Sequence, residues 1–354
     1  MVIWFKARLI LGYLLCFIAF FAPILGFIAP KGLAPLVIIG SIFCVLIIRF
    51  QSRKIRWAGL PVFMILFCFC LWALFSSLWS ADPVSSIIGS AKLFGNIFSG
   101  WLLFVTIKSL SIEEANLVRK FLSMGFFLAI CIVVFEILLG APIFSTIKGQ
   151  GYYIDRVRIE QFSDISWLNS VMVVLSLFVW PVSIGLYKKI IGSSIKIYPF
   201  LIIISGFSTI IILSTVISFY SGIVAIMFGL LASCIIFIFG RPAALLSILL
   251  TAVVSLVIPF GFNVSQSPIS QINSIIDLPT SAEHRIGIWK FTSDKVLEDP
   301  ILGWGMNASK NIPGGKSYLF AEDGAQYGRA LPLHPHNVLL QIWLELGLIG
   351  IVLF

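Results

Sequence analysis

The segment that organises this chain reads Leu333-His334-Pro335-His336-Asn337-Val338-Leu339-Leu340-Gln341-Ile342-Trp343-Leu344-Glu345-Leu346-Gly347. It holds two of the three histidines among 354 residues, and they stand where a polar stretch passes into an apolar one. An imidazole titrates near neutral pH, so a histidine at the edge of a membrane segment is suited to proton transfer. The segment therefore predicts a membrane helix that begins beside a candidate catalytic residue.

The composition of the whole chain indicates a membrane protein. It is 59% hydrophobic and 11% charged, with a mean hydropathy of +1.07, whereas soluble domains carry about 25% charged residues. The net charge of +9 does not indicate nucleic acid binding, because the basic residues fall between apolar runs, where they set the orientation of membrane helices. The cysteines lie in apolar runs without metal-ligand spacing, so the sequence predicts neither a disulfide framework nor a metal site.

Ten apolar runs are long enough to cross a bilayer, at approximately 9–29, 33–48, 58–79, 91–107, 121–140, 167–186, 198–217, 221–239, 243–262 and 337–354. Open strands are excluded in hydrocarbon because their edge groups would lack hydrogen bonds, and the alternation typical of a membrane β-barrel is absent. The predicted fold class is therefore all-α, a polytopic inner-membrane helical bundle with a long external loop that contains short helices.

The basic residues between these runs predict the orientation. If the N-terminus is cytoplasmic, 13 basic residues lie in the cytoplasm and 5 lie in the short outer loops, which fits the positive-inside rule. The predicted organisation is then a bundle of nine spans over 1–262, an external segment over 263–336 and a last span over 337–354. The last span ends without a basic anchor, so we expect the chain to be truncated from a protein of about twelve spans.

The external segment has an internal pattern of its own. Residues 265–279 are rich in Ser, Asn and Pro and predict irregular structure. A capping box at Thr280–Glu283 predicts a helix to Glu298, and Asp299-Pro300 predicts its end. The apolar face of this helix is expected to contain Ile286, Trp289, Val296 and Leu297. Residues 306–332 are predicted to form a loop or lid.

Several motifs resemble those of the O-antigen ligase and O-antigen polymerase superfamily. They are Arg285-x-x-x-Trp289, Asp299-Pro300-x-x-Gly303-x-Gly305, His336-Asn337-x-x-Leu340 with Glu345-x-Gly347, and the earlier Trp79-Ser80-Ala81-Asp82-Pro83. The order is also similar, with a long external loop between two late spans, an arginine near its start and a histidine at its end. The resemblance covers most of the chain in topology, while its most specific motifs occupy 283–347.

The resemblance implies a metal-independent glycosyltransferase without a cofactor, whose active site faces the periplasm. Its donor would be a glycan on undecaprenyl diphosphate, and its acceptor the lipid A–core oligosaccharide or another lipid-linked glycan. By this likeness His336 is the base that deprotonates the acceptor hydroxyl, and Arg285 is the second catalytic residue.

Chemistry alone gives a compatible site. Guanidinium forks match diphosphate oxygens without a metal, and the outer side offers Arg156, Arg158, Arg285 and Arg329. Arg156 and Arg158 are both candidates for binding the diphosphate, and the sequence does not choose between them. The supporting candidates are Trp289, Asn337, His334 and Glu345. Each has a structural alternative: Arg285 could be a surface residue, His334 a structural helper and Glu345 a packing group.

One expected feature is missing. The family often carries a Ser-Arg-Gly turn between two middle spans, and this chain reads Ser218-Phe219-Tyr220-Ser221-Gly222 there. The site therefore lacks one expected cation, which Arg158 or Lys148 could replace.

Four functions remain as hypotheses: the ligase first, then a polymerase, and after these a protein O-oligosaccharyltransferase or a polysaccharide transporter. A transporter should carry ionisable residues near mid-span and broken helices in paired positions. The spans here hold little beyond Glu136 and Glu345, and the polar candidates gather on the outer side. This distribution favours a surface-facing enzyme.

Overall fold

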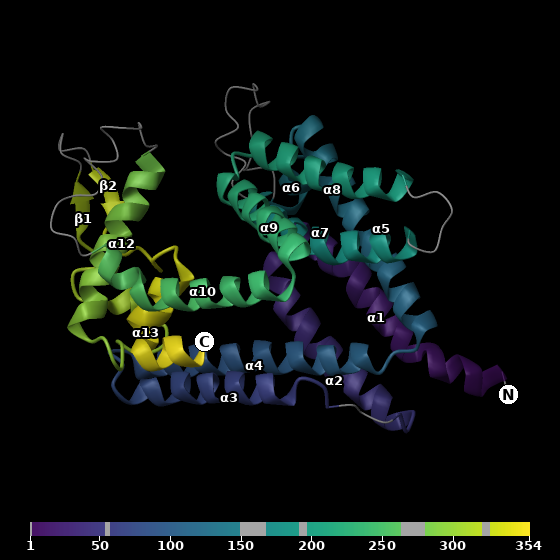
Figure 1. Cartoon of the computed structure of the whole chain (residues 1–354), viewed down its shortest axis with the longest axis horizontal. Coiled ribbons are helices and arrows are strands. Elements are labelled where there is room, and N and C mark those ends of the chain that lie inside the picture. The colour runs from purple at the N-terminus through teal and green to yellow at the C-terminus, as the bar shows by residue number, and fades with distance from the viewer. Residues whose placement is uncertain (1, 54–56, 149–167, 191–196, 263–279, 321–325) are drawn as a thin grey trace. The chain divides into compact units, whose positions relative to one another are not determined.

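The computed structural model describes residues 2–53, 57–148, 168–190, 197–262, 280–320 and 326–354 (Figure 1). In this part of the chain, eight helices are long and apolar enough to cross a membrane, and two shorter apolar stretches are Ile203–Val216 and Val338–Leu353. Each of the ten predicted spans coincides with one of the helices. The protein is therefore a multi-pass helical membrane protein, as the composition predicted.

The chain divides into two compact units. The first consists of Met1–Ala58 and Ser99–Ile238, and the second of Gly59–Phe98 and Phe239–Phe354. The helices of the first unit are α1 (Val2–Ile28), α2 (Leu33–Phe50), the second part of α4 (Pro83–Lys108), α5 (Ile112–Leu138), α6 (Pro142–Lys148), α7 (Asn169–Ile190), α8 (Ile197–Val216) and α9 (Tyr220–Phe239), with the short 3-10 turn η1 (Pro30–Gly32).

Helices α1 and α5 approach each other closely in the first unit. A Cβ atom placed on Gly125 would lie 2.1 Å from the carbonyl oxygen of Phe20. Small residues permit such backbone contact between membrane helices, where lipid supplies no hydrophobic drive for association. Next to this contact, Phe126, Met172 and Ile210 are almost completely buried and form the core of the unit.

The start of α5 shows why its helix begins before the apolar run at 121–140. Ser111 and Glu114 form a reciprocal capping box, which satisfies amides that a helix N-terminus leaves unpaired. Arg53 forms a double hydrogen bond with the Glu114 carboxylate, at 2.8 and 3.0 Å. Hydropathy finds the membrane part of α5, whereas these polar contacts set its first residue.

The second unit contains α3 (Leu60–Phe75), the 3-10 turn η2 (Ser76–Leu78), the first part of α4, α10 (Arg241–Gly261), α12 (Thr280–Glu298), the 3-10 turn η4 (Ala308–Asn311), the antiparallel strands β1 (Tyr318–Phe320) and β2 (Gln326–Arg329), and α13 (Val338–Leu353). Its buried core joins Ile288 and Val296 of α12 to Leu331 and to Trp343 and Leu344 of α13.

Helix α4 starts at Pro83, eight residues before the predicted span. The Asp82 carboxylate accepts a hydrogen bond from the Ser85 amide at 3.0 Å, and proline is favoured in the first helical turn. The first turns of α4 contain Ser85, Ser86 and Ser90. These polar residues lower the hydropathy of the segment without interrupting the helix, so a hydropathy window places the start too late.

Helix α12 confirms the helix expected up to Glu298, with a shifted buried face. Ile288 and Val296 are 0% and 1% exposed, whereas Ile286 and Leu297 are only half-buried. The fully buried Thr292 lies between Ile288 and Val296 on the same face, and its hydroxyl donates to the Ile288 carbonyl at 2.7 Å. A polar residue satisfied by its own helix can thus occupy a core position that a hydropathy pattern excludes.

The prediction of a loop over 306–332 was wrong in part. This stretch contains η4 and the β1–β2 hairpin, and Ala308, Ile312 and Leu331 are buried. Tyr318 pairs with Arg329 and Leu319 with Gly328 in the hairpin. The glycines that suggested a loop serve close packing instead: a Cβ atom on Gly328 would lie 2.7 Å from the His284 ring.

Candidate active site

A hydrogen bond joins α12, which carries Arg285 and Trp289, to the segment before α13. The indole Nε1 of Trp289 donates to the carbonyl oxygen of Pro335 at 2.9 Å. Arg285 lies four residues before Trp289, one turn nearer the helix N-terminus, and residues at this spacing share a face of the helix. The Arg-x-x-x-Trp motif therefore joins the arginine to the His334-Pro335-His336 segment.

His336 has an unusual backbone conformation. Its φ is +54°, in the left-handed region that few non-glycine residues adopt. The amide of His336 donates to Nδ1 of His334 at 3.3 Å, and the two rings lie 4.3 Å apart between centroids. Strained backbone of this kind gathers at functional sites. His334 thus supports the turn that presents His336.

The surroundings of His336 favour its neutral form. The residue is exposed, yet partial burial of the ring, followed by the positive charges of His334, Arg285 and His284, lowers the pKa of His336 below its ordinary value. A lowered pKa keeps the imidazole unprotonated, and therefore able to accept a proton, at neutral pH.

His284 connects α12 to the hairpin. Its Nε2 lies 3.0 Å from the carbonyl oxygen of Arg329, and because a carbonyl can only accept, Nε2 carries the proton. The ring occupies the space that Gly328 leaves open. No such role was predicted for His284 from the sequence, and Gly328, opposite the ring, is the signal that could have indicated it. The side chain of Arg329 itself is exposed.

Asn337 begins the last helix as predicted. Its side-chain oxygen accepts hydrogen bonds from the amides of Leu339 and Leu340, at 3.1 and 3.3 Å. This is the geometry of an N-cap, which satisfies amides that would otherwise lack partners. The His-Asn pair thus combines an exposed imidazole with the residue that fixes the start of α13.

Helix α13 is broken at Gly347, whose φ is +62° and ψ −162°. The break frees backbone groups that a continuous helix would pair. The glycine turn, residues 299–305, takes up several of them: the amides of Trp304 and Gly305 donate to the carbonyls of Leu344 and Glu345, both at 2.8 Å. Irregular backbone inside a membrane protein persists only where such partners exist.

Two further bonds complete the pairing. The Leu348 amide donates to the Pro300 carbonyl, and the indole of Trp72 donates to the Leu346 carbonyl, both at 2.9 Å. A Cβ on Gly347 would lie 2.2 Å from the Ile301 carbonyl oxygen, and one on Gly303 would lie 2.6 Å from the Gly347 amide. The Asp-Pro-x-x-Gly-x-Gly and Glu-x-Gly motifs therefore pack directly against each other and share backbone hydrogen bonds.

The Trp79–Pro83 turn packs on the same structure. The Trp79 indole donates to the Gly303 carbonyl at 2.9 Å. Ser86 donates to the Met306 carbonyl at 2.6 Å, and the Met306 amide donates to the Ser76 hydroxyl at 2.8 Å. The Trp79–Pro83 motif was predicted from the sequence, whereas Trp72, Ser76 and Ser86 were not. The signal that could have indicated these three residues is a polar group near the end of an apolar helix.

Glu345 is buried, at 3% exposed, and its carboxylate holds the start of η4. One oxygen accepts from the Asn307 amide at 2.8 Å and the other from the Ser309 hydroxyl at 2.6 Å. Gln341 adds a third hydrogen bond at 3.3 Å. The first two of these contacts join α13 to the start of η4.

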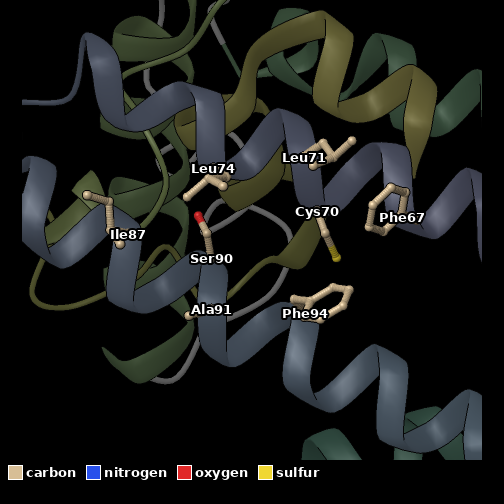
Figure 2. A pocket seen from close by; sticks show the side chains of 8 residues that line it. All are labelled: Phe67, Cys70, Leu71, Leu74, Ile87, Ser90, Ala91 and Phe94. Atoms are coloured by element: carbon tan, nitrogen blue, oxygen red, sulfur yellow. The ribbon is translucent and has the colours of Figure 1, made fainter.

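An apolar pocket of about 320 Å³ lies between α3 and α4 in the same unit (Figure 2). Its lining is Phe67, Cys70, Leu71, Leu74, Ile87, Ser90, Ala91 and Phe94. Figure 2 shows the side chains of the two helices facing each other across it. The Ser90 hydroxyl donates to the Ser86 carbonyl at 2.8 Å, so the lining suits hydrocarbon.

Some predicted features lie outside the described residues. They include Arg156 and Arg158, the irregular stretch 265–279 and the cap of α12. Among the described residues, no group of three His, Cys, Asp or Glu side chains could hold a metal ion. The Ser218–Gly222 segment runs from the connection after α8 into the first turn of α9, and Ser218 has a φ of +58°.

The fold and the site define a polytopic helical membrane protein with a histidine–arginine cluster beside a broken helix. The family described as O-Antigen ligase (Wzy_C) matches residues 200–354, which contain the cluster, the glycine turn and α13. Residues 200–354 are therefore similar to the O-antigen ligase family, which the motifs in 283–347 also resemble.

Relatives with related names occur in Rickettsia. A Rickettsia prowazekii protein named "Putative polysaccharide ligase" is 27% identical over 289 residues, 81% of this chain and 64% of the relative. A Rickettsia conorii protein of that name is 51% identical over 74 residues, 21% of this chain and 18% of the relative. The chain thus spans less than two thirds of the length of these relatives. No solved structure matches the chain.

Proposed function

We propose that this protein is a glycosyltransferase that moves a glycan from undecaprenyl diphosphate to the lipid A–core oligosaccharide at the periplasmic face of the inner membrane. The observation that carries the proposal is the hydrogen bond from Trp289, on the helix of Arg285, to Pro335, the neighbour of His336, in the segment that matches the O-antigen ligase family.

His336 is the base in this proposal. The neutral imidazole accepts the proton of the acceptor hydroxyl while the hydroxyl oxygen bonds to the anomeric carbon of the donor sugar. The bond from that carbon to the diphosphate breaks, and the electron pair leaves with the diphosphate. The lowered pKa of His336 supports this role, since the base must be unprotonated before the reaction starts.

Arg285 receives the departing charge. It is exposed on the first turns of α12, and a guanidinium binds phosphate oxygens in pairs without a metal ion. Arg156 and Arg158 are proposed as further cations at the diphosphate, on their place in the outer part of the sequence. They would supply the charge that the Ser218–Gly222 segment lacks.

The apolar pocket between α3 and α4 suits the isoprenoid chain of the donor. The α3–α4 connection is hydrogen-bonded to the glycine turn through Trp79 and Gly303, so the pocket and the histidine segment belong to one unit. Its lining offers hydrocarbon surface and no unpaired hydroxyl. A lipid tail held there would keep the diphosphate at the membrane edge.

The excess of basic residues on the side of the N-terminus supports the orientation. With 13 basic residues on that side and 5 in the short outer loops, the positive-inside rule assigns the first group to the cytoplasm. The three histidines then face the periplasm, where assembled lipid-linked glycans and lipid A–core meet.

Deletion of the gene in its own host tests the proposed acceptor. We expect lipid A–core without attached glycan, and accumulation of the lipid-linked polymer. Core that carries a single repeat would instead assign the protein to the polymerase of the same superfamily. Unchanged lipopolysaccharide, with glycan lost from proteins, would indicate a protein O-oligosaccharyltransferase.

A chelator tests the metal-independent chemistry. We expect the purified full chain to transfer glycan at an unchanged rate in excess EDTA. Loss of transfer in EDTA, with recovery on addition of Mg²⁺ or Mn²⁺, would contradict this part of the proposal.

A further inference from the structure

A groove that the proposed reaction does not use lies between α5 and α7 in the first unit. It has a volume of about 740 Å³ and is lined by Asn116, Arg119, Lys120, Ser123, Met124 and Phe127 of α5 and by Gly185 and Leu186 of α7. We call it the basic groove. It is larger than the apolar pocket of Figure 2 and combines charged with apolar side chains.

The chemistry of the basic groove changes along α5. Asn116, Arg119, Lys120 and Ser123 come first, and Met124 and Phe127 follow deeper in the same helix. Residues three, four and seven apart share one helix face. The groove therefore offers hydrogen-bond donors and positive charge near the N-terminal end of α5, and apolar surface toward the middle of this helix.

Arg119 is held in place within the groove. Its Nε donates to the Ala115 carbonyl at 3.3 Å, and one terminal nitrogen donates to the Asn116 side chain. Gly185 of α7 lies beside it, since a Cβ there would be in ordinary van der Waals contact, at 3.5 Å, with Cδ of Arg119. A preorganised guanidinium loses less conformational freedom when it binds an anion.

The charge of the groove is not neutralised by its own lining. None of the described lining residues is acidic. The nearby Glu114 is bound to Arg53 at 2.8 Å and caps its own helix through Ser111.

We propose that the basic groove binds the phosphate headgroup of an anionic membrane phospholipid. Arg119 and Lys120 contact the phosphate, while Met124, Phe127 and Leu186 contact the first part of the acyl chains. Basic pockets between membrane helices at the cytoplasmic side are suited to such headgroups, and the distribution of basic residues assigns this end of α5 to the cytoplasm. The binding is independent of the glycosyl transfer proposed above.

The test uses the purified full chain in a neutral detergent. Phosphatidylglycerol and phosphatidylcholine with the same acyl chains are added separately, and retained lipid is measured by native mass spectrometry together with the thermal unfolding midpoint. We expect phosphatidylglycerol to be retained at least about tenfold better than phosphatidylcholine and to raise the midpoint. Equal retention of both lipids would overturn the proposal.

Two variants locate the site. The double variant Arg119→Gln with Lys120→Gln should lose the preference for phosphatidylglycerol about tenfold or more, since each cation near an anionic lipid contributes favourably. The single variant Lys120→Gln, at an exposed position, should lose part of it and keeps the test valid if the double variant does not fold. Lys108→Gln, at the end of α4 in the same unit, is the matched control and should retain the preference.

Inorganic phosphate serves as a probe to distinguish binding of a lipid headgroup from binding of free phosphate. Inorganic phosphate at millimolar concentration should neither raise the unfolding midpoint nor displace phosphatidylglycerol. A midpoint raised equally by inorganic phosphate in the parent, and not in the double variant, would overturn the lipid assignment. A double variant that retains phosphatidylglycerol as the parent does would exclude the groove as the binding site.

Discussion

The indole nitrogen of Trp289 lies 2.9 Å from the carbonyl oxygen of Pro335, to which it donates a hydrogen bond. Pro335 separates the two histidines of the site, and Trp289 belongs to the helix that carries Arg285. One hydrogen bond therefore connects the helix of the candidate anion-binding arginine to the segment that carries the candidate base. The bond explains why an arginine and a tryptophan four residues apart should accompany a histidine that follows about fifty residues later.

Replacement of Trp289 by Phe should lower glycan transfer about tenfold while membrane insertion stays normal. The ring keeps its packing, but the Pro335 carbonyl loses its donor, and such a bond contributes about 0.5–1.5 kcal/mol. Transfer measured with purified protein in liposomes checks this expectation. Trp101→Phe is the matched control, since its indole donates to the Ala58 carbonyl at 3.1 Å in the other unit. Equal losses in both variants would show a general effect on folding.

The rate of transfer should depend on pH through His336. Because its pKa is lowered, the base form should dominate at pH 7, and the rate should fall only as the pH decreases through that lowered pKa. His334→Ala removes a positive charge and part of the burial, so the pKa of His336 should rise and the acid limb should move to higher pH. A pH–rate profile of both proteins measures the shift. If the acid limb does not move in the His334→Ala protein, His334 does not influence the pKa of His336, and this prediction is wrong.

Gly347→Ala should prevent the break in α13 from forming. The combination of φ +62° and ψ −162° belongs to a region used almost solely by glycine, and strain of this kind costs about 1–3 kcal/mol before any steric clash is added. We expect a lower thermal unfolding midpoint and loss of transfer. Gly100→Ala in α4, where a new Cβ meets nothing within 4 Å, should be neutral or stabilising. A Gly347→Ala protein as stable as the parent would contradict the described break.

Arg285→Lys keeps the charge and removes the guanidinium fork. If Arg285 binds the diphosphate through two parallel hydrogen bonds, KM for the lipid diphosphate donor should rise about tenfold or more. Arg329→Lys, at another exposed position on the hairpin, is the control and should leave KM unchanged. Parent-like kinetics of the Arg285→Lys protein would argue against bidentate binding.

The ten spans could be predicted from sequence because hydrocarbon thickness and apolar run length are directly related. Their starts could not always be predicted. The first turns of α4 and α5 are polar and form through Asp82 and the Ser111–Glu114 capping box, which a hydropathy window averages away. The buried face of α12 was shifted for a similar reason, since Thr292 satisfies its hydroxyl within the helix.

The connections within the candidate site could not be predicted from the sequence. His336, Arg285 and Trp289 stood out through their spacing, and a hydrogen bond joins Trp289 to Pro335, beside His336. The hydrogen bonds from the glycine turn to Leu344 and Glu345 join residues about forty positions apart, and those from Trp72 and Trp79 join residues more than 220 positions apart. No local pattern encodes such pairings. Only the glycines, needed for close backbone approach, mark their places.

The most direct test of the account measures glycan transfer by His336→Asn and His336→Ala proteins in liposomes that contain the lipid-linked donor and lipid A–core. Asn tolerates the left-handed backbone at this position and has no titratable group, so His336→Asn should insert and fold like the parent. We predict that both variants transfer glycan about 100-fold to 10,000-fold more slowly, the usual contribution of a general base. Transfer at the parent rate by either folded variant would contradict the assignment of His336 as the base.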